Sequence, residues 1–227
     1  PSFRGDWKMP GAGCIQCFDE VSLDLLKKEE IDIPIGGKDD YNEDPTTSSF
    51  WKNIENDAHT KKFFSWYNNQ LCEHADRVLI EARRILGDNV NIFAKVPCIN
   101  LYSSHPSHAA EATAGAYSFN DDGAFERFAR SFSKFEIGLS IDGLELSEDK
   151  KLLSDPIKLI KEAYDQSLVM DITFRGENKE ETYGAKEILN ILSWSNHQDY
   201  GVRRFTFNRL SDNTMSPGNW IMFNELV

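Results

Sequence analysis

The sequence predicts an α/β fold built around a parallel sheet. Four short apolar segments, each suited to a buried strand, alternate with longer segments in which apolar residues recur at helical spacing. This alternation is typical of parallel sheets, because each parallel connection needs a crossover of a dozen or more residues. The units would form either an open sheet or half of an eight-unit barrel, and periodicity alone leaves both arrangements open.

The strands and helices follow one another in a regular order. The first fifty residues come before them and are turn-rich, with one short acidic helix near 21–30. The predicted strands are 91–96, 137–141, 167–174 and 203–208. The predicted helices are 60–86, 122–134, 155–166, 184–195 and 218–227. Gly87 is placed to end the first of these helices, and Pro156 stands in the first turn of the third, where proline is tolerated.

Composition and charge narrow the class of protein. The 227 residues include 25 Lys and Arg against 37 Asp and Glu, which gives a formal net charge of −12. This charge would repel a nucleic acid or an anionic membrane, so neither is expected as a partner. No apolar run approaches the roughly 18 residues that a membrane-spanning helix requires. Aromatic residues make up 12% of the chain, which argues against disorder and leaves rings for a binding cleft.

Polar residues that could carry chemistry follow the carboxyl ends of the predicted strands, where both candidate folds place their sites. These polar segments are 95–108, 142–145, 175–181 and 209–212. Glu177 lies between Gly176 and Asn178, which suits a general base with an amide to orient it. The charged residues that follow Glu177 favour a solvated loop carboxylate instead, so both interpretations stay open at this point.

Two further patterns have both a chemical and a structural interpretation. His108 and Glu111 would share a helical face and could bind a metal ion, but without an H-E-x-x-H motif a hydrogen-bonded structural histidine is favoured. Cys14 and Cys17 have the spacing of a redox pair. Because no second close pair completes a zinc site, free thiols in a reducing compartment are favoured. No metal and no cofactor is expected.

Several segments together resemble the plant β-amylase family, glycoside hydrolase family 14. The motifs that carry the resemblance occur in family order and run over almost the whole chain. They are Gly11 to Cys17, Phe63-Phe64-Ser65-Trp66-Tyr67, Lys95-Val96, Ser107-His108-Ala109-Ala110-Glu111-Ala112-Thr113-Ala114-Gly115, Asp122-Gly123, Gly143-Leu144-Glu145, Gly176-Glu177-Asn178 and Arg209-Leu210-Ser211-Asp212. An ordered series of this length does not arise by chance.

The resemblance implies a (β/α)₈ barrel that releases maltose from the non-reducing ends of α-1,4-glucans with inversion. Residues 1–227 would form its C-terminal half, from the loop after the fourth strand through the eighth. The N-terminal half of the same barrel, absent from this chain, would then be a partner. Inverting hydrolysis needs a general acid and a general base. By resemblance Glu177 is the base, and the acid lies upstream of Pro1.

Other cleft positions that the resemblance identifies are partly kept and partly changed. The kept substrate-binding positions are Lys95, Asn178 and Arg209. Asn100 and Asp142 also line the expected cleft, but they stand where the family has a sugar-contacting His and an inner-loop Thr. Asp142 adds a negative charge that is expected to make ionisation of neighbouring carboxylates costlier. Ser140 replaces the usual Asn, and the run 179–182 (Lys-Glu-Glu-Thr) replaces Ala-Leu-Pro-Arg, whose Leu inserts between sugars.

These departures favour a β-amylase-like protein of starch metabolism with a degenerate site. Such a protein would be catalytically inactive or impaired, and would bind glucan weakly or bind another starch enzyme. The alternative is an active inverting exo-hydrolase that releases maltose, and a third possibility is a glucan sensor that binds without turnover. By resemblance the location is the plastid stroma.

Overall fold

The computed structural model describes residues 15, 17, 19–33, 43–119, 123–180, 184–196, 200–208, 211–212 and 216–224. The chain divides into two compact units. Unit 1 comprises 1–77, 99–127 and 149–155, and unit 2 comprises 78–98, 128–148 and 156–227. Each unit is described by itself, and the candidate site lies in unit 2.

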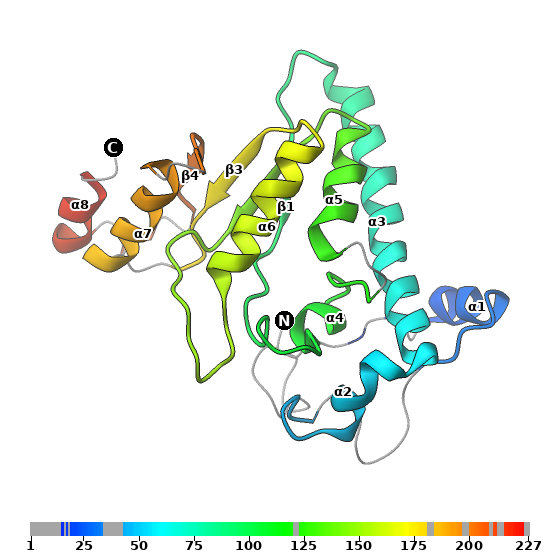
Figure 1. Ribbon diagram of the computed structural model, residues 1–227. Helices are drawn as coiled ribbons and strands as arrows, with labels where there is room; N and C mark the ends of the chain where they lie inside the picture. The colour runs from blue at the N-terminus through cyan, green and yellow to red at the C-terminus, as the bar shows by residue number, and fades with distance from the viewer. Residues whose placement is uncertain are drawn as a thin grey trace. The chain divides into compact units, whose positions relative to one another are not determined.

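Unit 2 contains a parallel sheet with the strand order β1-β2-β3-β4 (Figure 1). The strands are β1 (Phe93–Val96), β2 (Gly138–Asp142), β3 (Phe174–Glu177) and β4 (Phe205–Thr206). Every neighbouring pair is parallel, with Lys95 opposite Ser140 and Asp142 opposite Glu177. The predicted parallel sheet is confirmed.

The helices agree with most of the predicted ones. They are α1 (Glu20–Lys28), α2 (Ser49–Asn53), the short 3₁₀ helix η1 (Ile54–Asn56), α3 (Ala58–Leu86), α4 (Ala109–Thr113), α5 (Gly123–Ser133), α6 (Pro156–Val169), α7 (Ala185–Asn196) and α8 (Pro217–Asn224). Of the described helices, α2, η1 and α4 were not predicted, because three to five residues are too few for a periodic pattern to develop.

One predicted strand, 167–174, was wrong over most of its length. Helix α6 continues through Val169, and the chain leaves it by way of Asp171, whose backbone is left-handed with φ of 52°. The amide of Ile172 donates to the carbonyl of Ser167, which closes this C-terminal turn. The apolar residues that suggested a strand, Leu168 and Val169, lie exposed on the last turn of the helix. Strand β3 begins only at Phe174.

The two faces of the sheet differ in polarity because successive side chains of a strand point to opposite faces. Leu139, Ile141 and Phe174 belong to the apolar face and are buried. Helix α6 packs against β2, and Figure 1 shows it lying across the sheet. The other face carries Lys95, Ser140, Asp142, Arg175 and Glu177, which come from the alternate positions of β1 to β3. The second face, rather than the hydrophobic one, is the candidate for chemistry.

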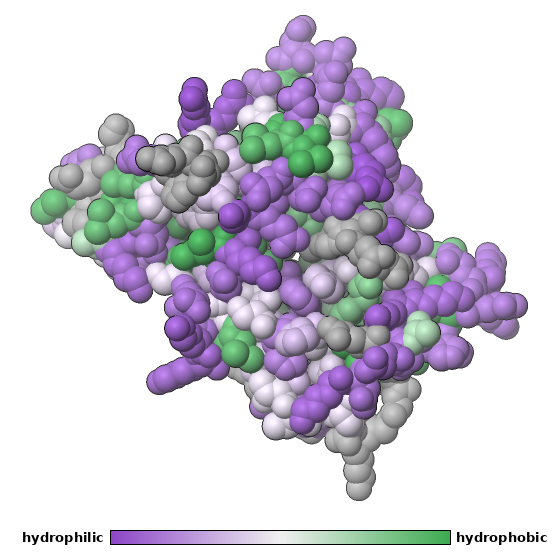
Figure 2. Space-filling model, viewed as in Figure 1, coloured by the Kyte–Doolittle hydropathy of each residue, from purple (hydrophilic) through white to green (hydrophobic). Residues whose placement is uncertain are grey.

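Helix α7 is amphipathic. Its buried side chains Ile188, Ile191 and Trp194 recur every three residues, close to the helical repeat. Leu189 lies outside this stripe and is 64% exposed. Figure 2 shows hydrophobic surface over α7 and α8, and Leu189 and Ile221 of these helices are exposed.

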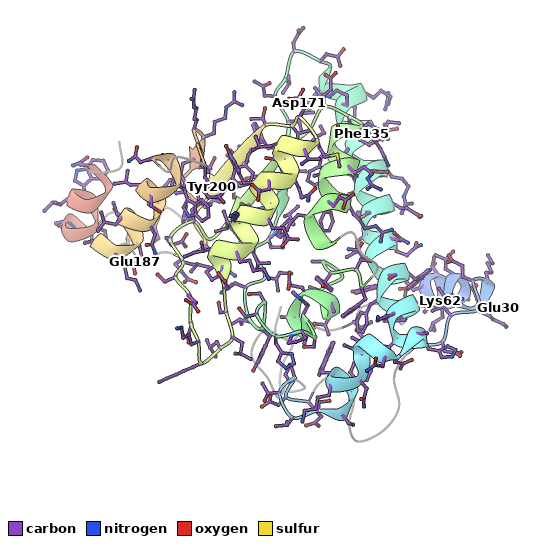
Figure 3. The ribbon with its side chains drawn as sticks, in the orientation of Figure 1. Glu30, Lys62, Phe135, Asp171, Glu187 and Tyr200 are labelled. Atoms are coloured by element: carbon purple, nitrogen blue, oxygen red, sulfur yellow. The ribbon has the colours of Figure 1, made fainter. Side chains whose placement is uncertain are left out.

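Unit 1 has its own core, built around the amino-terminal part of α3. Trp51 stacks on Phe64 with a centroid separation of 5.9 Å, and Phe63 stacks on Tyr67 at 6.1 Å. Lys62 of α3 donates to the carbonyl oxygens of Glu29 and Glu30, and in Figure 3 its side chain points toward the end of α1. A cation at the C-terminus of a helix compensates the helix dipole there.

The start of α3 is capped by Asp57. Its carboxylate accepts hydrogen bonds from the backbone amide of His59 at 3.0 Å and from the hydroxyl of Thr60 at 2.6 Å. The bond from His59 satisfies an orphan backbone donor of the first turn. None of the described helices is both long and apolar enough to cross a bilayer.

Candidate functional site

Glu177 is the last residue of β3 and is 4% exposed. Its Oε1 accepts hydrogen bonds from the hydroxyl of Ser140 at 2.5 Å and from Nη2 of Arg175 at 3.1 Å. Its Oε2 accepts from the side-chain amide of Asn208, and Nζ of Lys95 lies 3.0 Å away. Each carboxylate oxygen therefore faces two donors.

These donors decide the protonation of Glu177. Burial raises the pKa of its carboxyl, but the hydrogen bonds from Ser140, Lys95 and Asn208, together with the charge of Lys95, outweigh burial and leave the pKa lowered. The group is therefore an ionised carboxylate at neutral pH. A carboxylate with a lowered pKa is a weaker proton acceptor.

Lys95 lies between two buried carboxylates. Its Nζ is 3.0 Å from Oε2 of Glu177 and 3.2 Å from Oδ2 of Asp142. Burial lowers the pKa of Lys95, whereas its hydrogen bond to Glu177 and the charges of both carboxylates raise it, and the net direction is upward. The other oxygen of Asp142 accepts the backbone N–H of Cys98 at 2.8 Å. Asp142 therefore connects the lysine to the segment that follows β1.

Asn178, directly after β3, is hydrogen-bonded to the segment after β4. Its amide nitrogen donates to the carbonyl oxygens of Asn208 at 2.9 Å and Glu180 at 3.0 Å, and its amide oxygen accepts the backbone N–H of Asn208. The side chain is 1% exposed. This arrangement also positions Asn208, whose own side chain reaches Glu177.

Glu145 fixes the segment after β3 from another direction. Its Oε1 accepts the backbone N–H groups of Lys179 at 2.7 Å and Glu180 at 2.6 Å. Its Oε2 is buried and has no hydrogen-bond partner among the described residues. Burial raises the pKa of Glu145, the charge of Glu180 adds to this, and the main-chain hydrogen bonds only partly oppose it, so the net direction is upward.

The whole chain, residues 1–227, matches the family model described as glycosyl hydrolase family 14. The chain belongs to glycosyl hydrolase family 14. It is 35% identical over 250 residues to beta-amylase 5 of Arabidopsis thaliana, covering 100% of this chain and 49% of the relative. It is 30% identical over 247 residues to inactive beta-amylase 9 of the same plant, covering 100% of this chain and 45% of the relative. The chain thus spans about half the length of these relatives.

A solved structure supports the fold of this family 14 chain. The catalytic domain of a β-amylase from Paenibacillus polymyxa superposes with a TM-score of 0.72 at 20% sequence identity, covering 97% of this chain and 57% of that one. The four parallel strands are therefore part of a (β/α)₈ barrel, as the resemblance implied. In such barrels the carboxyl ends of the strands carry the active site, and Glu177 lies at one of them.

The structure brings four of the six proposed site residues of the family 14 cleft together in unit 2. They are Lys95, Asp142, Glu177 and Asn178. Asn100 belongs to unit 1, where its amide donates to the hydroxyl of Ser154 at 2.7 Å. Arg209 lies outside the described residues. Sugar contacts by any of these residues stay predictions.

The expected electrostatic effect of Asp142 on Glu177 stays a prediction, because several other groups also act on this carboxyl. Its charge was expected to make ionisation of neighbouring carboxylates costlier, yet the pKa of Glu177 is lowered. The hydrogen bonds from Ser140, Lys95 and Asn208, together with the charge of Lys95, lower it. Lys95 also contacts Asp142, so its charge offsets the repulsion between the two carboxylates. A substitution that adds a charge cannot be interpreted without its counterion.

Two residues that contact Glu177, Arg175 and Asn208, were given no role from the sequence, although Arg175 lies in the polar segment 175–181. Both carried a usable signal. Arg175 stands two positions before Glu177, so in a strand both side chains share a face. Asn208 directly precedes Arg209, which the resemblance identifies as a cleft residue. Ser140 was noted only as a departure from the family, although its hydroxyl donates to Oε1 of Glu177 at 2.5 Å.

The other two patterns noted in the sequence lie in unit 1. His108 and Glu111 form the expected structural hydrogen bond, with Nδ1 2.7 Å from Oε2, and the ring of His108 stacks on Tyr117 at 4.0 Å. Cys14 is outside the described residues. Burial, and to a smaller extent the charge of Asp19, raises the pKa of Cys17 to about 11. Within the described part of the chain, no three His, Cys, Asp or Glu side chains gather as a metal site would require.

Glu145 provides a pH test of this loop geometry. Because its pKa is raised in the folded state, Glu145 contributes stability below its unfolded value near 4.5, and this contribution is lost as the pH rises through the folded value. Glu145→Gln keeps the oxygen that accepts both amides but cannot ionise. In the complete protein, the free energy of unfolding of Glu145→Gln relative to the parent is therefore expected to rise between pH 4 and pH 7. Denaturant titrations at a series of pH values measure this, and a constant difference would contradict it.

Proposed function

We propose that this chain is part of a β-amylase-like protein of starch metabolism whose degenerate cleft binds α-1,4-glucan but hydrolyses it slowly or not at all. The observation that carries the proposal is the set of four donors around Glu177. An ionised carboxylate offers about four lone-pair sites. A nucleophilic water would have to displace one of these donors before Glu177 could accept its proton.

The lowered pKa of Glu177 points the same way, because the base is held in a form with little affinity for a proton. The substitutions at Asn100, at Asp142 and over 179–182 are consistent with relaxed demand for turnover. A relative that bears the name inactive beta-amylase shares 30% of its aligned residues with this chain.

Two protein partners and a location belong to this proposal. The strands β1 and β4 are edge strands of the described sheet, and the N-terminal half of the same barrel would pair with them. Another starch enzyme is a further candidate partner. The word chloroplastic in the names of two relatives supports a plastid location.

One observation favours an active inverting exo-hydrolase as the second candidate. Glu177 is ionised, stands at the carboxyl end of a barrel strand and faces a lysine, as a general base can. In that case a second carboxyl group, outside this chain, would protonate the leaving oxygen.

Maltose release from soluble starch by the complete protein distinguishes the two candidates. Glu177→Gln is the matched blank, because it keeps the shape of the side chain and removes its basicity. We expect the parent and Glu177→Gln to release maltose at the same rate. If Glu177 were a working general base, the substitution would instead slow the release by roughly 10²–10⁴-fold. Faster release by the parent would establish the active hydrolase. Titration calorimetry with maltotetraose is expected to give binding heat for both proteins.

A further inference from the structure

Lys179 connects two segments that are not neighbours in the sheet. It follows β3, and its Nζ donates to the carbonyl oxygen of Cys98, which follows β1, at 2.8 Å. Strand β2 lies between β1 and β3. Neighbouring strands are about 4.8 Å apart, so the lysine side chain spans the carboxyl end of β2, where Asp142 is located.

Both ends of this connection are held by buried carboxylates. The backbone N–H of Lys179 donates to Glu145 at 2.7 Å, and the backbone N–H of Cys98 donates to Asp142 at 2.8 Å. Glu145 is 2% exposed and Asp142 is 7% exposed. The backbone is therefore held in place both at Lys179 and at the acceptor Cys98. This reduces the loss of conformational entropy that the hydrogen bond between them must offset.

The position of this connection places it in competition with a sugar. Cys98 follows β1, and Asp142 and Glu177 are the last residues of β2 and β3. A glucan that reaches Glu177 has to pass over the same strand ends. The charge-assisted bond from Lys179 to Cys98 occupies an acceptor in this region. A glucosyl hydroxyl would have to displace the ammonium or be excluded by it.

We propose that Lys179 is a built-in strap across the candidate site, whose bond to Cys98 lowers the affinity for α-1,4-glucan. The inference rests on the proposed function, since it concerns glucan binding at the same site. It makes Lys179 a specificity-determining residue. The strap opens when a ligand supplies a better partner for the carbonyl of Cys98 or for the ammonium.

The first test asks whether the strap exists, and it needs no glucan. In the complete protein, Lys179→Met keeps the length and apolar stem of the side chain but removes the donor. Lys186→Met is the matched control, because Lys186 is an exposed lysine in α7. Amide hydrogen exchange of the segments 97–99 and 178–180 is expected to become faster in Lys179→Met and to stay unchanged in Lys186→Met. Unchanged exchange in Lys179→Met would overturn the proposal.

The second test measures the consequence for binding, with maltotetraose as the probe in titration calorimetry. Loss of one charge-assisted hydrogen bond is expected to let Lys179→Met bind about tenfold tighter than the parent. Lys186→Met should bind as the parent does. Equal or weaker binding by Lys179→Met, alongside measurable binding by the parent, would overturn the inhibitory role. In a third outcome, amide exchange becomes faster in Lys179→Met while neither the parent nor any variant binds the probe. That result would confirm the bond between Lys179 and Cys98 and would contradict both its inhibitory role and the proposed glucan-binding function.

Discussion

Replacing Lys95 by Met in the complete protein is expected to lower the free energy of unfolding at pH 7 by about 2 kcal/mol. The change removes the cation that contacts Asp142 at 3.2 Å and Glu177 at 3.0 Å. Both carboxylates are buried and lie opposite each other on β2 and β3, so they would repel across adjacent strands. The figure is below the usual cost of breaking a buried pair because the lysine side chain is 44% exposed and water screens it.

The pH dependence of this loss identifies its cause. The folded-state pKa of Glu177 is below its usual value of 4.5, so its contribution to stability is present above that value and is lost as the pH falls through the folded value. The difference between parent and Lys95→Met should therefore shrink below about pH 4. Denaturant titrations at several pH values measure it. Lys95→Arg keeps the charge and should retain most of the stability, and a loss independent of pH would indicate packing instead.

Gly176→Ala is expected to lower the free energy of unfolding by about 3 kcal/mol. A Cβ atom at this position would meet Cδ2 of Leu144 at 2.1 Å and Cδ1 at 2.8 Å. Leu144 is 1% exposed, so its side chain has no free space into which it can move. The strand would have to shift, and the shift would move Glu177, the next residue, away from its donors.

A matched control comes from Gly218, where a Cβ atom would meet nothing within 4 Å. Gly218→Ala lies in α8 and is expected to leave stability unchanged or to raise it by less than about 1 kcal/mol. Combining Gly176→Ala with Leu144→Ala relieves the collision, so the double variant should lose less stability than the sum of the single losses. Thermal and urea unfolding of the parent and of the four variants, Leu144→Ala included, measure these differences. Full stability of Gly176→Ala would show that the strand accommodates the methyl group.

Helix α6 illustrates why one boundary could not be predicted from the sequence. The apolar run 167–174 contains a helix end, a left-handed turn at Asp171 and the first residue of β3. Apolar residues were taken to be buried, but Val169 is 72% exposed at the end of α6. The strand proper, Phe174-Arg175-Gly176-Glu177, has a mixed composition because one of its faces is polar. Hydropathy patterns cannot identify a strand whose inward face carries charges.

The sequence alone determined the features that depend on local pattern and on family motifs. It predicted a parallel α/β sheet from strand-helix alternation, a glycoside hydrolase barrel from ordered motifs, and Glu177 as the residue of interest. The sheet and the barrel are confirmed, because periodicity reflects which faces are buried and a motif retains the residue types that its chemistry needs. The role of Glu177 stays a prediction.

Only the tertiary structure decided how Glu177 is surrounded. Its donors come from β1, β2, β3 and the segment after β4, at positions 95, 140, 175 and 208, so no short motif contains them. Whether Asp142 disturbs Glu177 depends on an ammonium from a third strand, and the bond from Lys179 to Cys98 joins residues 81 positions apart. Charges and hydrogen bonds act over a few ångströms in space, and the fold alone determines which distant residues come that close.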